Sequence, residues 1–288
     1  MKVFLKLISI LGSAFLLPIL LAEQAWAWGP AIHAAISCTV LDKAVSVFPA
    51  VANVIQSFPF EYIYGSLAAD FMVGKGQKQR PGHPHNWETG FRFLGEATDD
   101  QEAAYAYGFL SHLAADVVAH NYFVPDLVHR ASKLKRMGHI YWEVRADHFV
   151  GPGYMRIAKD VLNMEKLDCD DMLRLAVGKK RPGLRARRQL FTQSVKLTDF
   201  LSCSQSLFLV NRSSRYHISP DYLSFMLNLS YRLVKDFLKR PYTSRCLSYD
   251  PIGTRNLRLA GRNKLISKVF HQPPPMFRFD VDQELLEL

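Results

Sequence analysis

Apolar and polar residues follow one another along this chain at helical rather than strand-like intervals. After Pro30, a residue type that suits the first position of a helix, residues 31–47 mix Ala, Ile, Val and Leu without period-two alternation. Shorter apolar stretches at residues 50–57 and 60–69 are divided by Pro59, which indicates two short helices. Because strand-like alternation is scarce throughout, we predict an all-α fold with several helices.

The longest predicted helix occupies the middle of the chain. It runs from about residue 101 to residue 123, with Asp100 as its N-terminal cap and Pro125 as its break. A loop rich in Gly and Pro is predicted before it, at residues 71–82. The remaining helices are predicted at residues 88–94, 139–150, 189–210 and 221–238.

The central helix carries three side chains that its apolar pattern does not explain. His112, Asp116 and His120 are spaced four residues apart, so on a helix they lie one above the other on the same face. The same spacing joins His139 to Glu143. One such pair is usually a surface or capping pair. Two pairs in apolar surroundings favour a zinc site, because imidazole nitrogen and carboxylate oxygen on rigid elements suit that ion.

The first 27 residues have the pattern of a secretory signal peptide. Lys2 and Lys6 give a basic start, residues 7–22 are apolar, and residues 25–27 (Ala-Trp-Ala) form a small-x-small cleavage site. Cleavage at this site makes Trp28 the first residue of the mature chain. We therefore expect the protein to be secreted or periplasmic.

The composition allows one large domain or two small ones. The chain has 288 residues, of which 49% are hydrophobic and 22% charged, so it can bury a sizeable core. We divide the mature chain into a zinc-site helical region at 28–152, a C-terminal helical region of the same or a second domain at 153–272, and a tail at 273–288. Six basic residues at 179–188 are most simply a solvated loop. The formal net charge of +10 favours contact with anionic lipid or nucleic acid without choosing between them.

From the start of the mature chain onward, the sequence contains in this order Trp28, His33, Asp70, His85, His112, Asp116, His120, His139 and Glu143, which is the order of metal ligands in a known family. With these residues in this order the chain resembles the secreted zinc-dependent phospholipases C, which are related in fold to the single-strand-specific zinc nucleases of fungi and plants. The resemblance implies an all-α fold with a metal cleft between its helices and up to three zinc ions. His83 is the alternative to His85 as a ligand, and His129 is the alternative to His120.

The resemblance also implies how these ligands divide among the ions. One zinc would be held by Asp70, His85, His112 and Asp116; a second by His33 and the free amino group and carbonyl of Trp28, with Asp116 as a bridge; and the third by His120, His139 and Glu143. Asp70 would in addition orient or deprotonate the water that attacks a phosphodiester.

The first function implied is that of a phospholipase C, a monomer acting on phospholipid at a membrane surface. The alternative enzyme is a single-strand nuclease, which would need aromatic side chains near the metals on which bases can stack. A non-catalytic zinc-binding protein, attached to a membrane surface by its basic second half, is a third possibility. The aromatic candidates for base stacking are Tyr62, Tyr64, Trp87, Tyr141 and Trp142.

Overall fold

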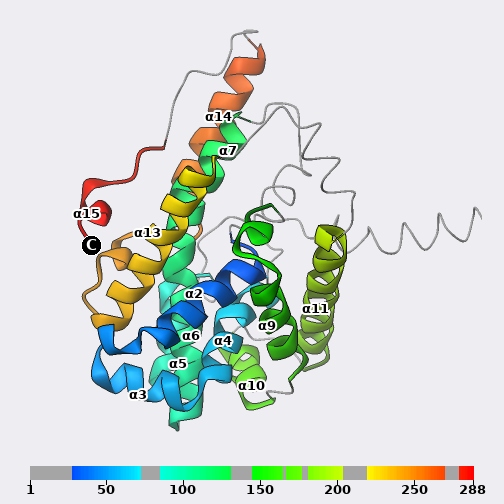
Figure 1. The fold of residues 1–288 in the computed structure, drawn as a ribbon, viewed down its shortest axis with the longest axis vertical. Coiled ribbons are helices and arrows are strands. Elements are labelled where there is room, and N and C mark those ends of the chain that lie inside the picture. The colour runs from blue at the N-terminus through cyan, green and yellow to red at the C-terminus, as the bar shows by residue number, and fades with distance from the viewer. Residues whose placement is uncertain are drawn as a thin grey trace, which may run out of the picture.

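The computed structural model describes residues 28–72, 85–130, 145–164, 167–176, 181–203, 219–269 and 279–288. All regular elements in these segments are helices, which confirms the predicted all-α fold (Figure 1). Within the same residues, no helix has the length and apolar character needed to cross a bilayer.

The helices fall into two groups along the chain. Those of the first half are α2 (Pro30–Asp42), α3 (Pro49–Ser57), α4 (Pro59–Ala68), α5 (Trp87–Glu96), α6 (Asp100–Val118) and α7 (Val124–Arg130), with the short turns η1 (Ala44–Ser46), η2 (Ala69–Met72) and η3 (Ala119–Phe123). Those of the second half are a helical stretch at 145–150, α9 (Pro152–Asn163), α10 (Leu167–Ala176), α11 (Arg181–Cys203), α13 (Pro220–Lys239), η4 (Arg245–Ser248), α14 (Thr254–Val269) and α15 (Gln283–Leu286).

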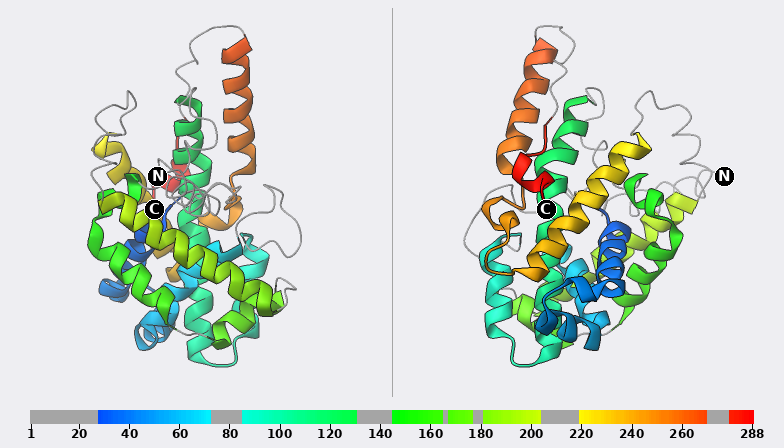
Figure 2. Two further views of the ribbon diagram at one scale, coloured as in Figure 1. Left: turned by 90° about the vertical axis from the view of Figure 1, so that its right-hand side faces the viewer. Right: turned by 60° about the vertical axis from the view of Figure 1, so that its left-hand side comes forward.

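Helix α6 is the centre of the fold, with α4, α5 and α13 packed around it (Figures 1 and 2). Two glycines let the backbones of α4 and α6 touch. A Cβ atom added to Gly108 would lie 1.9 Å from the carbonyl oxygen of Tyr62, and one added to Gly65 would lie 2.1 Å from that of Tyr105. This close approach places the end of α4, and with it Asp70 on η2, beside His112 of α6.

Helices α6 and α7 are joined without a break, which corrects the predicted end of the central helix at Pro125. Residues 119–123 form a π-helix, and α7 continues directly from Val124. A π-helical turn absorbs one extra residue, and such turns occur often at functional sites. Pro125 therefore lies inside a continuous helix, directly after the π-helical turn, and its missing N–H group leaves one carbonyl of that turn without a main-chain donor. The N-terminal cap of α6 is also one residue earlier than predicted, since the side chain of Asp99 accepts from the Glu102 amide.

The basic run is not a solvated loop over its whole length, because α11 begins at Arg181. Arg188 turns back into the protein. Its guanidinium group donates to Asp170 Oδ2 at 2.9 Å and to the Met164 carbonyl at 2.6 Å. It also lies 5.8 Å from the centre of the Tyr64 ring. One charge of the run thus stabilises packing among α4, α10 and α11.

Both halves of the chain contribute to one hydrophobic core, which includes Ile32 and Phe109 from the first half and Leu233 from the second. Residues 279–288, inside the segment predicted as a tail, pack against this core. Leu285 of α15 is fully buried. Arg232 of α13 donates to the carbonyl oxygens of Leu286 and Leu288, which holds this segment in place.

Candidate metal centre

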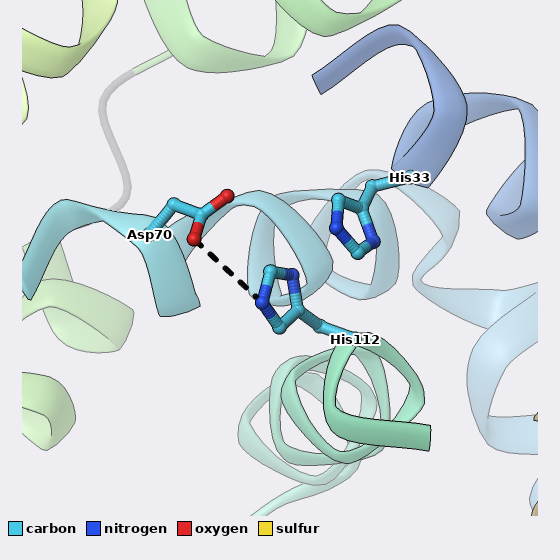
Figure 3. Close-up of side chains that lie close together, drawn as sticks. All are labelled: His33, Asp70 and His112. Atoms are coloured by element: carbon cyan, nitrogen blue, oxygen red, sulfur yellow. Dashed lines mark ion pairs between the residues drawn. The ribbon is translucent and has the colours of Figure 1, made fainter. Parts of the chain in front are cut away.

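Six buried imidazole and carboxylate side chains converge around the middle of α6. Each is at most 7% exposed, although histidine and aspartate are seldom fully buried without partners. Figure 3 shows three of them, brought together from α2, η2 and α6. The six side chains are His33 on α2, Asp70 on η2, His85 just before α5, His112 and Asp116 on α6, and His120 on η3.

Asp116 is surrounded by imidazole nitrogens. Its Oδ1 atom lies 3.4 Å from Nε2 of His33. Its Oδ2 atom lies 3.1 Å from Nε2 of His112 and 3.4 Å from Nε2 of His120. Burial by itself would raise the pKa of this carboxyl, but the histidines outweigh burial and hold the pKa of Asp116 well below its ordinary value. Asp116 is therefore ionised and has imidazoles on both of its oxygens.

Asp70 forms the second carboxylate of the cluster. Its Oδ1 atom lies 3.3 Å from Nε2 of His85 and 3.7 Å from Nε2 of His112 (Figure 3). The Nε2 atoms of His85 and His112 are 3.2 Å apart. Ligand atoms of His33, Asp70 and His112, and likewise those of His85, His112 and Asp116, lie within 4.8 Å of one another. Such distances allow one ion to contact three of these side chains at once.

The orientation of His112 favours a cation at the centre of the cluster. Its Nδ1 atom lies 2.8 Å from the carbonyl oxygen of Ser66, an acceptor, so Nδ1 carries the proton. In a neutral ring, Nε2 then presents a lone pair to the carboxylate of Asp116 and to Nε2 of His85. Acceptors that face one another in this way need a proton or a metal ion between them. A carbonyl that fixes the tautomer is also typical of metal-binding histidines.

Several buried atoms of the cluster have no hydrogen-bond partner among the described residues. They are both ring nitrogens of His33, Nδ1 of His120 and Oδ1 of Asp116. Buried polar atoms without partners are unfavourable by about 1–3 kcal/mol each, and native proteins rarely contain them in groups. The nitrogen and oxygen atoms are those that zinc prefers, so the residues fit the metal that the sequence pattern implies.

Asp147 supports the cluster from outside. Its carboxylate accepts from the main-chain amides of Ala31, at 3.3 Å, and Ile32, at 3.1 Å, in the first turn of α2. This contact fixes the helix that carries His33. It also explains Gly29, where an added Cβ atom would lie 2.2 Å from Asp147 Oδ2. In the sequence, the only signal at Asp147 is its position shortly after the His139–Glu143 pair. Its contact with α2 could not be inferred from that spacing.

Trp28 is fully buried at the start of α2. Its indole nitrogen donates to Ser230 Oγ of α13 at 3.0 Å, and its ring lies 4.5 Å from that of Phe123 on η3. Two contacts from distant parts of the chain therefore fix this residue beside the elements that carry His33 and His120.

The other predicted ligands lie at or beyond the limits of the described structure. His139, Glu143 and His83 fall outside the described residues. His129 belongs to α7, of which only the backbone is described at that position. Asp147 and His148 follow the His139–Glu143 pair in the sequence, and of these two residues Asp147 is buried and His148 is exposed.

The fold and the cluster together define an all-α protein with a candidate metal centre built on one central helix. The family described as zinc dependent phospholipase C matches residues 18–176, which is more than half of the chain, and the chain belongs to this family. No curated protein and no solved structure matches it. All six side chains of the cluster lie within the matched residues, whereas α11, α13 and α14 lie beyond them. Membership supports a hydrolase of the phospholipase C type that depends on zinc.

Proposed function

We propose that this protein is a secreted or periplasmic zinc-dependent phosphodiester hydrolase, and specifically a phospholipase C that cleaves glycerophospholipids at a membrane surface. The observation that carries the proposal is the position of Asp116, whose two carboxylate oxygens face imidazoles from α2, α6 and η3. A carboxylate in this position can bridge two cations. The predicted signal peptide, which ends just before Trp28, supports export.

The proposed ligand sets follow the family resemblance, and the short distances among Asp70, His85, His112 and Asp116 support the first of them. Asp70, His85, His112 and Asp116 would hold one zinc, His33 and the amino group of Trp28 a second with Asp116 as bridge, and His120 with His139 and Glu143 a third. Bound zinc would supply Lewis acidity, which lowers the pKa of a water molecule towards about 7 and neutralises charge on a phosphate.

The protein's own groups would orient the reaction. In this proposal Asp70 accepts a hydrogen bond from the attacking water and takes its proton, because its carboxylate lies at the edge of the cluster beside His85 and His112. The Ser66 carbonyl keeps the His112 ring in one tautomer. Asp147 keeps the first turn of α2, and so His33, in place.

Phospholipid is the preferred substrate because three of the candidates for base stacking, Tyr62, Tyr64 and Trp87, make other contacts. Tyr62 and Tyr64 are fully buried, and their hydroxyl groups donate to Ser111 and Asp170. Trp87 packs against Phe237 of α13. Tyr141 and Trp142, the other stacking candidates, lie outside the described residues.

One preparation of the zinc-loaded protein, assayed on phosphatidylcholine vesicles and on single-stranded DNA, tests the proposal. We expect release of phosphocholine and diacylglycerol, with DNA left intact. Asp70→Asn should reduce the rate by at least about 100-fold, since a general base contributes 10²–10⁴-fold. His148→Ala, which changes an exposed side chain, should retain the rate. Hydrolysis of DNA alone would favour the nuclease, and zinc content without turnover on either substrate would favour a binding protein.

A further inference from the structure

The π-helix that carries His120 has a backbone that its own helix cannot fully satisfy. In this π-helix the amide of Val124 donates to the carbonyl of Ala119, five residues earlier. Pro125, the next residue, has no amide hydrogen, so it cannot donate to the carbonyl of His120 in the same register. Main-chain carbonyls of this turn are therefore available to groups from elsewhere in the chain.

Those groups come from residues 249–256, which we call the 249–256 segment. The side-chain amide of Asn256 donates to the carbonyl of Asn121 at 2.7 Å. In the opposite direction, the side-chain amide of Asn121 donates to the carbonyl of Asp250 at 2.9 Å, and also to that of Val117 within the helix. The neighbour of His120 is thus bonded to the segment through both its main chain and its side chain.

Gly253 brings the segment against His120 itself. An added Cβ atom would lie 2.1 Å from the carbonyl oxygen of His120 and 2.8 Å from its Cβ atom. The φ angle of Gly253 is +62°, a conformation that glycine adopts without the strain that other residues incur. Both the space and the backbone conformation therefore require glycine where the segment meets the histidine.

The segment is internally braced and so can act as a rigid support. The carboxylate of Asp250 accepts from the amides of Ile252, at 2.9 Å, and Thr254, at 3.0 Å, which fixes the turn before α14. The carbonyl of Tyr249 accepts from the indole nitrogen of Trp87 at 2.8 Å. Because Trp87 follows His85 by two residues, the segment contacts the flanks of two candidate ligands.

We propose that the 249–256 segment is a positioning element for the metal centre, in which Asn256 and Gly253 set the place of His120 as a zinc ligand. This inference rests on the metal centre of the proposed function. It adds to that centre a part of the chain that lies beyond the family match at residues 18–176. Residues that orient metal ligands commonly change metal affinity by 10–100-fold when they are replaced.

Zinc affinity, measured by competition with a chelator, tests the proposal without any assay of activity. Asn256→Ala and Gly253→Ala should each lower the affinity for the most weakly held zinc by about 10-fold or more. Asn263→Ala is the matched control, because Asn263 lies two turns further along α14 and is also half-buried. It should leave the affinity within about twofold. Circular dichroism shows whether each variant retains its helices, and Asn256→Ala keeps the test valid if Gly253→Ala fails to fold.

A double-mutant cycle with His120→Ala separates positioning from general destabilisation. If Asn256 acts through His120, Asn256→Ala should change zinc affinity by less than about twofold once His120 is absent. The proposal is overturned if Asn256→Ala leaves zinc affinity unchanged, or weakens it equally with and without His120. Absence of zinc from the wild-type protein would overturn the metal centre as well, whereas zinc binding that ignores Asn256 would overturn this inference alone.

Discussion

The imidazole ring of His33 stacks on that of His112, with the ring centroids 4.0 Å apart and the planes 19° from parallel. The two residues lie on different helices, and both side chains are buried. The stacking holds two candidate ligands from separate helices side by side, and each lies within 3.4 Å of an oxygen of Asp116.

The first prediction concerns His112, which lies near four of the other five side chains of the cluster. His112→Ala should remove at least one zinc per chain and abolish diester hydrolysis, because it removes an imidazole that lies within 4 Å of both carboxylates. Elemental analysis of the purified variant measures the loss. His148→Ala is the control and should keep the wild-type zinc content, since that side chain is exposed. Full zinc content in His112→Ala would exclude this residue as a ligand.

The second prediction concerns the N-terminus of the mature chain. If the amino group of Trp28 binds zinc, a protein that retains Ala27 should hold one zinc fewer than one that begins at Trp28. Trp28→Phe keeps a free amino group but loses the indole bond to Ser230, so it should keep the zinc. It should lower the free energy of unfolding by about 1 kcal/mol, the net contribution of one hydrogen bond, because Ser230 still donates to the Met226 carbonyl. Equal zinc content with and without Ala27 would contradict the assignment.

The third prediction concerns pH and Asp147. Burial raises the pKa of this carboxyl, the amides of Ala31 and Ile32 lower it, and the charge of Asp70 raises it, with a result of about 7. Between the ordinary value of 3.8 and about 7, the folded metal-free protein therefore binds more protons than the unfolded chain. Its free energy of unfolding should fall as pH rises through this range, by at most about 4 kcal/mol at about 1.4 kcal/mol per pKa unit.

Urea denaturation in the presence of a chelator, at pH values from 4 to 8, measures this effect. The difference in free energy of unfolding between the wild type and Asp147→Asn should change with pH between pH 4 and 7. It should level off above pH 7, where the Asp147 carboxyl is ionised in both the folded and the unfolded protein. Asp116 affects the free energy of unfolding over a different pH range. Because its pKa is lowered, its contribution is present above the ordinary aspartate pKa and is lost only as pH falls below it. Parallel curves for the two proteins between pH 4 and 7 would contradict the prediction for Asp147.

The fourth prediction concerns the contact between α4 and α6. Gly108→Ala should lower the free energy of unfolding by at least about 2 kcal/mol, because the new methyl group meets the Tyr62 backbone at 1.9 Å and cannot rotate away. Gly95→Ala is the matched control on α5. No described atom lies within 4 Å of its added Cβ, so it should stabilise the protein by up to about 1 kcal/mol through helix propensity. Thermal unfolding followed by circular dichroism compares the two, and equal midpoints would contradict the close contact.

Helical spacing was sufficient to place His112, Asp116 and His120 on one side of the central helix, because that spacing is a local property of the chain. The order of Trp28, His33 and Asp70 along the sequence indicates the family but gives no distances. The contacts among these elements depend on tertiary packing, and above all on the glycines between α4 and α6, whose role no periodic pattern reveals.

The two errors in the sequence interpretation have different causes. Pro125 usually marks the end of a helix, but here the preceding π-helical turn shifts the hydrogen-bond register and lets the helix continue. The run of basic residues suggested solvent, yet Arg188 finds a buried carboxylate in Asp170 from another helix. The adjacent π-helical turn decided the first outcome, and a partner on another helix decided the second.

The bond between Trp28 and Ser230 joins the start of the mature chain to a helix that is synthesised some 200 residues later, and the support of His120 comes later still. A chain that extends only to the end of α10 contains all the described candidate ligands but lacks both Ser230 and Asn256. Under the proposed function, a truncated chain that ends after α10 should therefore bind zinc more weakly than the complete chain.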